Sequence, residues 1–278
     1  MQVADMMRKT VITATADMSL AQAQQRMHEH RVRHLPVMAR TQLIGLLTDR
    51  DLRDALPSTV TTLGQDDIAQ HLDTIAVEAC MTAPVRTISS KADAVEAARQ
   101  LLQTHYGCLP VVDHEHLVGI VTELDMLRGF LAAAVPAGDY LTVKDYMHTN
   151  LRTVTPEDFV HTARERMQEA RIRHLPVVTP EQKLAGIISD RDVRQANASR
   201  LPQFAAYEAP EQLQALPVQR IMTTQVLTVQ RDTPVADAGQ RLLEQRLGCL
   251  PVIRADNVVE GIITVTDLIS AYVQLYQA

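Results

Sequence analysis

A hydroxyl residue is followed three residues later by an aspartate at four places in this chain: TDRD at 48–51, TELD at 122–125, SDRD at 189–192 and TVTD at 264–267. At the start of a helix this spacing forms a near capping box, in which the hydroxyl and the carboxylate each accept a hydrogen bond from an amide. Such a cap contributes about 1 kcal/mol and needs no ligand. Capping alone therefore explains any single copy, although capping and ligand binding are compatible.

Arginines surround the first and third copies. Each copy has two before a predicted strand and two in the first turn of the predicted helix that follows: Arg31, Arg33, Arg50 and Arg53, then Arg171, Arg173, Arg191 and Arg194. Cations at a helix N-terminus oppose the helix dipole by about 0.3 to 1 kcal/mol each, and a bound anion reverses that penalty. Because guanidinium groups bind phosphate in a planar, bidentate way, the pattern predicts a phosphate site. The alternative is an exposed arginine stripe that serves only solubility.

Two five-residue sequences alternate along the chain, RHLPV at 33–37 and 173–177, and GCLPV at 107–111 and 248–252. The first places His34 and His174 beside the arginines, where each either contacts phosphate or donates a hydrogen bond to a backbone carbonyl. In the second, Gly107 and Gly248 stand where the other copies have arginine. We expect glycine at this position to let a flat base approach the backbone.

Motifs for catalysis and metal binding are absent from the sequence. It contains no G-x-S-x-G, H-E-x-x-H, Walker loop or G-x-G-x-x-G. His30 and His34 are four residues apart, but Pro36 and the strand pattern place His34 beyond the helix. The three cysteines, Cys80, Cys108 and Cys249, lack C-x-x-C spacing, which predicts reduced thiols. We expect a protein that is not an enzyme, has no metal site and requires no cofactor.

The composition limits the possible partners. The 278 residues are 46% apolar and only 3% aromatic, and the net charge is −6. An acidic chain with few aromatic residues is not expected to bind nucleic acid or an anionic membrane. The N-terminus lacks the apolar segment of a signal peptide, which predicts a cytoplasmic location.

The residues with binding potential lie on a unit that recurs four times. Each copy begins with a short predicted strand around a threonine: VITAT at 11–15, VRTIS at 85–89, LRTVT at 151–155 and VLTVQ at 226–230. An amphipathic helix, two further strands and a second helix follow, which gives a β-α-β-β-α unit of about 55 residues. A unit of this size buries too small a core to be stable alone, so the units are expected to pack in pairs.

The alternation of the two sequences sets the predicted organisation. Copies 1 and 3 resemble each other, as do copies 2 and 4, so the larger repeat is a pair of unlike units. The predicted order is unit 1 at 1–56, an insert at 57–77, unit 2 at 78–131, a linker at 132–142, unit 3 at 143–197, an insert at 198–217 and unit 4 at 218–278. Each insert is expected to hold a short helix. The predicted fold class is α+β, with the four units packed as two pseudo-two-fold modules.

Four strands of the type h-P-V and four G-h-h-[ST]-x-x-D turns, anchored at Gly45, Gly119, Gly186 and Gly261, resemble those of cystathionine-β-synthase (CBS) domains, which pair as Bateman modules. The resemblance covers nearly the whole chain. It implies that clefts between paired units bind an adenosine-containing ligand. The aspartates of the turns would take the ribose hydroxyls and the hydroxyl residues would lie near phosphate: Asp51, Asp125, Asp192 and Asp267, with Thr48, Thr122, Ser189 and Thr264.

The resemblance also implies a role for a hydroxyl at the end of the first strand. The residues there are Thr15, Ser89 and Thr155, whereas copy 4 departs from the pattern with Gln230. Together with Arg33, His34, Arg50, Arg173, His174 and Arg191, these residues complete the predicted ligand-binding set.

The predicted function is non-catalytic energy sensing through AMP, ADP or ATP, with Mg²⁺ in the case of ATP. The sequence leaves several alternatives open. The ligand could be S-adenosylmethionine, NAD or a cyclic dinucleotide, or the clefts could be vestigial in a protein-interaction scaffold. We expect an unidentified regulated protein as partner. The four units could form a disc within one chain, or the chain could form a homodimer.

Overall fold

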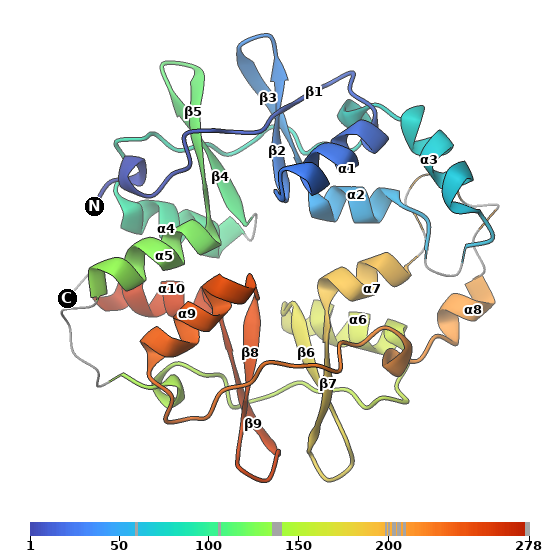
Figure 1. The fold of residues 1–278 in the computed structure, drawn as a ribbon, viewed down its shortest axis with the longest axis vertical. Coiled ribbons are helices and arrows are strands. Elements are labelled where there is room, and N and C mark those ends of the chain that lie inside the picture. The colour runs from blue at the N-terminus through green and yellow to red at the C-terminus, as the bar shows by residue number, and fades with distance from the viewer. Residues whose placement is uncertain are drawn as a thin grey trace.

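A computed structural model of the chain describes residues 1–58, 61–104, 107–134, 141–197 and 210–275, with Ser199, Leu201, Phe204 and Tyr207. Four α+β units surround a common centre, with the first two in one half of the molecule and the last two in the other (Figure 1). One chain therefore completes the disc-like arrangement. Among the described residues, no helix has both the length and the apolar character needed to cross a membrane.

The first half of the chain contains units 1 and 2. Unit 1 consists of η1 (Val3–Asp5), β1 (Ala14–Thr15), α1 (Leu20–Glu29), β2 (His34–Ala39), β3 (Gln42–Thr48) and α2 (Asp49–Ala55). The insert holds α3 (Gln65–Asp73). Unit 2 consists of η2 (Val77–Ala79), α4 (Ala94–Thr104), β4 (Cys108–Asp113), β5 (His116–Thr122) and α5 (Glu123–Ala134).

The second half repeats this order. Unit 3 consists of η4 (Val143–Asp145), α6 (Val160–Ala170), β6 (His174–Val178), β7 (Leu184–Ser189) and α7 (Asp190–Ala196). The insert holds α8 (Pro210–Gln214), so both inserts contain the predicted short helix. Unit 4 consists of η6 (Val218–Arg220), α9 (Val235–Gln245), β8 (Cys249–Ile253), β9 (Val259–Thr264) and α10 (Val265–Leu275). Residues 135–140 of the predicted linker lie outside the described residues.

The antiparallel hairpin is the regular part of each unit, whereas the predicted five-residue first strand is not. Within the described residues, only unit 1 forms a first strand, the two residues of β1, which pair in parallel with β2. In the other units the same segment makes a single parallel bridge to the hairpin, such as Ile88 to Val111. The segment crosses the hairpin edge at one point, so its β-branched residues serve packing more than pairing.

The segment before each first strand crosses to the paired unit. The amide of Val3 donates to the carbonyl of Ala92, 3.0 Å away, and the amide of Val77 donates to the carbonyl of Met18, 2.8 Å away. A methionine of each crossing segment packs on a glycine of the partner hairpin. The Met147 side chain, for example, packs directly on Gly261. Its Sδ lies 2.7 Å from the position that a Cβ on this glycine would take. The glycines of the four turns are thus required for packing.

The two modules meet in two chemically different ways. On one side α5 packs against α10, with the rings of Phe130 and Tyr272 stacked at a centroid distance of 3.3 Å. A single apolar core runs through units 2 and 4 there. On the other side α2 and α7 face each other (Figure 1) and are joined by ion pairs.

Candidate functional site

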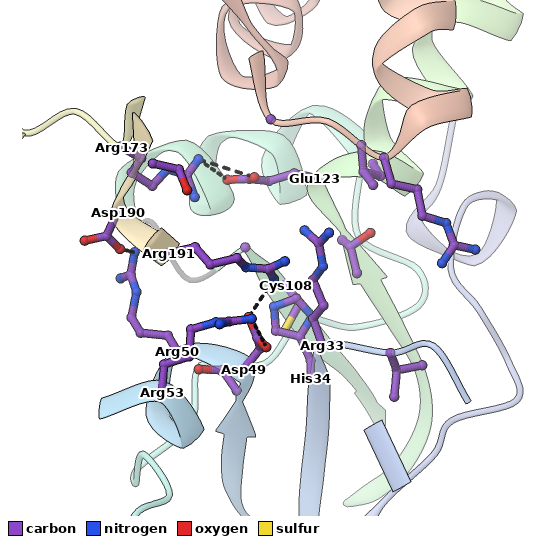
Figure 2. Close-up of a pocket in the computed structure, with 18 of the residues that line it drawn as sticks. Arg33, His34, Asp49, Arg50, Arg53, Cys108, Glu123, Arg173, Asp190 and Arg191 are labelled. Atoms are coloured by element: carbon purple, nitrogen blue, oxygen red, sulfur yellow. Dashed lines mark hydrogen bonds and ion pairs between the residues drawn. The ribbon is translucent and has the colours of Figure 1, made fainter. Parts of the chain in front are cut away.

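A cavity of about 1000 Å³ lies between the modules and is lined by residues of all four units. Among the described residues, its wall contains ten arginines but only five carboxylates, although the whole chain has a net charge of −6. A concentration of positive charge in an acidic chain creates a local field that attracts anions. Figure 2 shows the charged side chains of α2 and α7 converging in this cavity.

The turns of units 1 and 3 place their aspartates at the cavity wall. Asp51 Oδ2 accepts hydrogen bonds from the Thr48 amide at 2.8 Å and from Thr48 Oγ1 at 2.7 Å. Asp192 Oδ2 does the same with Ser189, at 2.8 Å and 2.6 Å. These are capping boxes, so the capping role of both residues is confirmed. Within the described part of the chain, no hydrogen bond or ion pair reaches Oδ1 of either carboxylate.

Asp125 and Asp267, in units 2 and 4, cap their helices with Thr122 and Thr264 in the same way. Of these four residues, only Thr122 lines the cavity. The predicted ligand-binding residues thus separate into a set that surrounds the cavity and a set that does not.

The arginines at the two helix starts pair across the module interface. Arg50 Nη2 lies 3.1 Å from Asp190 Oδ2, and Arg191 Nη2 lies 2.6 Å from Asp49 Oδ2. Burial acts to raise the pKa of Asp49, but Arg53 and Arg191 hold it below its usual value. The sequence pattern predicted a bound anion to balance these arginines. Carboxylates of the facing helix balance part of their positive charge instead.

The second arginine of each predicted helix lies in its last turn, which corrects the sequence-based placement in the first turn. Each helix has only seven residues. Arg53 Nη1 donates to Gln195 Oε1 at 3.1 Å, and Arg194 Nη1 lies 2.8 Å from Asp54 Oδ2. These two arginines add to the contacts that join α2 to α7.

Four arginines of the cavity, Arg31, Arg33, Arg86 and Arg246, have no carboxylate partner within the described ranges. Burial lowers the pKa of Arg33, and nearby Arg191, Arg53 and Arg246 lower it further, although Asp49 acts in the opposite direction. Like charges are thus held close together here. The counterpart of Arg33 in unit 3, Arg173, instead pairs with Glu123 of unit 2 at 3.2 Å (Figure 2).

The two histidines of the RHLPV sequences are neutral. Burial lowers the pKa of both His34 and His174 to about 4, and the adjacent arginine adds to the effect. The His34 ring faces Gly107 of the paired unit, and a Cβ on that glycine would lie 3.4 Å from His34 Nε2. A Cβ on Gly248 would lie only 2.8 Å from His174 Cε1.

This contact accounts for the alternation of RHLPV and GCLPV. The pseudo-two-fold axis of each module brings the start of one hairpin against the start of the other, where one imidazole ring fits against a glycine. The expectation that glycine lets a base approach the backbone stays a prediction: a histidine of the same chain lies against each glycine, and both glycines also line the cavity.

The hydroxyls predicted at the end of the first strand lie outside this cavity. Ser89 Oγ donates to Asp113 Oδ1 at 2.9 Å, and Thr155 Oγ1 accepts from the Asp158 amide at 3.3 Å. Thr15 is exposed and pairs through its backbone with Met38. All three belong to local turn or strand structure, and their ligand role stays a prediction.

Sequence reasoning missed the start of the first-strand segment, which lines the cavity in units 1, 2 and 4 at residues 10–12, 84–86 and 225–227, together with Thr82 and Thr223 just before it. A signal was available. A methionine precedes the first strand by four residues in every copy, at Met7, Met81, Met147 and Met222. These methionines mark the segment that crosses to the paired unit.

Two of the three thiols are buried at the cavity wall. Burial raises the pKa of Cys108 and raises that of Cys249 to about 12, so neither forms a thiolate near neutral pH. Cys80 is half-buried and unpaired by any disulfide. In the described residues, no three His, Cys, Asp or Glu side chains are grouped to hold a metal ion.

The fold and cavity define a protein made of paired repeat units that enclose a cationic site. The CBS domain family matches the chain four times, at residues 3–58, 77–132, 143–199 and 218–274. The chain belongs to the CBS domain family and contains two tandem pairs of these domains.

Similar proteins span both the whole chain and one module. MJ1225 of Methanocaldococcus jannaschii, suggested to be an archaeal homologue of g-AMPK, is 24% identical over 95% of this chain and 96% of its own length. Its crystal structure has a TM-score of 0.75 at 22% identity and covers 98% of this chain and 100% of that chain, which establishes the fold. A Pyrococcus horikoshii structure has a TM-score of 0.64 at 20% identity, with the same coverage.

A third relative matches about half of the chain. CBSX2 of Arabidopsis thaliana is 32% identical over 51% of this chain and 68% of its own length. CBSX2 has been solved in complex with AMP, and that structure has 30% identity and a TM-score of 0.41 over 49% of this chain and 98% of that chain.

Proposed function

We propose that this protein is a non-catalytic sensor that binds an adenine nucleotide, AMP, ADP or ATP, in the central cavity. In this proposal the phosphates contact the arginines, and Asp51 or Asp192 receives the ribose hydroxyls. Binding changes the relation between the two modules and thereby the affinity for a regulated protein.

The observation that carries the proposal is the excess of arginine over carboxylate in the cavity wall. Arg33 supports it most directly, since three other guanidiniums lower its pKa and no carboxylate among the described residues pairs with it. Holding like charges together costs free energy in the protein alone, and a phosphate group would offset that cost. A ligand without phosphate would gain less from this wall.

The free oxygen of each cavity aspartate supports the ribose contact. Oδ2 of Asp51 and of Asp192 is used for capping, and Oδ1 has no partner in the described ranges. A carboxylate oxygen is a strong acceptor for a hydroxyl donor. Capping fixes the carboxylate in place, so the interpretation as a cap and the interpretation as a ligand contact support each other.

The ion pairs between α2 and α7 provide a route from binding to a change of shape. Arg50 and Arg191 are held by Asp190 and Asp49 of the facing helix. A phosphate competes with these carboxylates for the same guanidiniums. A ligand can shift a conformational equilibrium only by its differential affinity for the two states, and this competition supplies such a difference.

Isothermal titration calorimetry with AMP, ADP, ATP and adenosine tests the proposal, starting with AMP because AMP is bound in the solved CBSX2 structure. The nucleotides should bind at least tenfold more tightly than adenosine, because phosphate contacts are charge-assisted. A nucleotide at a hundred times its dissociation constant should also stabilise the protein by about 2.7 kcal/mol. Equal binding of AMP and adenosine, or no thermal response to any nucleotide, contradicts the proposal.

S-adenosylmethionine, NAD and a cyclic dinucleotide belong in the same titration series. S-adenosylmethionine carries no phosphate, so the arginines should favour AMP over it. Preference for S-adenosylmethionine would show that the cationic wall does not select the ligand.

A further inference from the structure

We propose that only two of the four clefts bind nucleotide, those with Asp51 and Asp192, because Arg8 and His148 block the aspartates of the other two. This inference rests on the proposed function, in which an aspartate of each cleft receives the ribose. It adds a built-in limit on the number of sites, set by one residue position in each crossing segment.

Four equivalent residues follow the methionines of the crossing segments. Each forms a backbone bridge to the same point of the second hairpin strand in the paired unit: Arg8 with Ile120, Thr82 with Leu46, His148 with Ile262 and Thr223 with Ile187. The turn with the capping aspartate begins only two residues beyond that point. Each of these side chains is therefore placed next to the aspartate of the paired unit.

In units 1 and 3 this position is basic, and the aspartate of the paired unit is occupied. Arg8 Nε lies 3.0 Å from Asp125 Oδ1, and Arg128 Nη1 lies 3.1 Å from the same oxygen. His148 Nε2 lies 2.8 Å from Asp267 Oδ1. Because Oδ2 of each aspartate is already used for capping, both oxygens have protein partners. Only 1% of the Asp125 side chain and 14% of the Asp267 side chain is exposed.

In units 2 and 4 this position is threonine, and the aspartate of the paired unit stays available. Thr82 and Thr223 carry no charge, and both line the cavity together with Asp51 and Asp192. Asp125 and Asp267 do not line it. The partners of Oδ1 and the lining of the cavity therefore both favour the same two clefts as open.

The residue type that follows the methionine, basic or threonine, thus decides whether a cleft can bind nucleotide. Arg8 and His148 take the position of a ligand hydroxyl on the carboxylate, and a nucleotide would have to displace them. In unit 2 it would also have to displace Arg128 from a buried carboxylate. Unit 4 has only His148 on this oxygen within the described residues, which makes it the unit to test.

Calorimetry with AMP measures the number of sites per chain. The wild-type chain should bind two AMP molecules, and Asp51→Ala and Asp192→Ala should each reduce the number to one. His148→Thr, which copies Thr82 and Thr223, should raise it from two to three because it frees Asp267. His148→Arg is the matched control, since it copies Arg8 and should leave the number at two.

The His148 side chain is 67% exposed, so its replacement by threonine or arginine should leave the fold intact, which a thermal melt checks. A wild-type number of one, three or four overturns the inference while the proposed function stands. A folded His148→Thr protein that still binds two AMP molecules also overturns it. Absence of AMP, ADP and ATP binding to the wild-type chain overturns both proposals, so the two failures are distinguishable.

Discussion

Replacing Arg33 with methionine removes a charge that is unfavourable in the protein alone and favourable with a nucleotide bound. Burial and three neighbouring guanidiniums lower the pKa of Arg33, so the folded protein disfavours its charged form relative to the unfolded chain. The substitution keeps much of the apolar stem that packs on the wall. The melting temperature without nucleotide should therefore stay the same or rise.

Affinity should change in the opposite direction. A hydrogen bond to a charged group contributes about 1.5 to 3 kcal/mol, and each step of about 1.4 kcal/mol is tenfold in affinity. Loss of one such contact predicts about 10- to 100-fold weaker AMP binding. Because Arg191, Arg53 and Arg246 lie close enough to lower the pKa of Arg33 and would remain in the variant, we expect the lower end of this range.

Calorimetry and a thermal melt of the same samples measure both effects. Arg152→Met is the control, because Arg152 is exposed and lies outside the cavity lining. A lower melting temperature for Arg33→Met with unchanged AMP affinity would refute the reasoning, since Arg33 would then be a structural residue. Binding should also weaken with added salt, most for ATP and least for AMP, because screening acts on each phosphate charge.

Three further predictions test the site and its supports. Asp192→Ala should weaken AMP binding in the Asp192 cleft about 10- to 100-fold, so that calorimetry finds one site of wild-type affinity, and should also cost about 1 kcal/mol in a denaturant titration through the lost cap, whereas Asp192→Asn should keep much of the cap. Gly186→Ala should destabilise the protein by about 1 to 3 kcal/mol, because a Cβ there would lie 2.8 Å from the Thr223 carbonyl oxygen; an unchanged denaturation midpoint would contradict this packing. The lowered pKa of His34 and His174, about 4 against 6.5, means that the unfolded chain binds more protons between these values, so stability should fall as the pH drops from 6.5 to 4. Glutamine at both positions should make that fall shallower in urea titrations at each pH.

The sequence determined the features that depend on near neighbours. The four units and the alternation of unlike copies follow from apolar periodicity and repetition. The capping of Asp51 and Asp192 could also be predicted, because the hydroxyl and the carboxylate are three residues apart and the helix itself brings them together. Seven of the ten cavity arginines were identified in the sequence, whereas Arg8, Arg86 and Arg246 were not, and no ion-pair partner was predicted.

The tertiary structure decided which of these residues are available. Asp51 and Asp125 have the same local pattern, yet only Asp125 is held by Arg8, which is 117 positions away in the chain. Arg50 is likewise paired with Asp190 across 140 positions. The contact between His34 and Gly107 arises because the pseudo-two-fold axis brings two hairpins together.

The physical reason is the difference in sequence separation between the groups that interact. A helix cap acts within one turn of backbone, so the order of residues is enough to predict it. Hydrogen bonds and ion pairs between side chains act over about 3 to 4 Å, and only packing of the four units brings their partners to that distance. The arginines could therefore be recognised in the sequence as candidates for phosphate binding, but only the fold decided which carboxylate oxygens have protein partners.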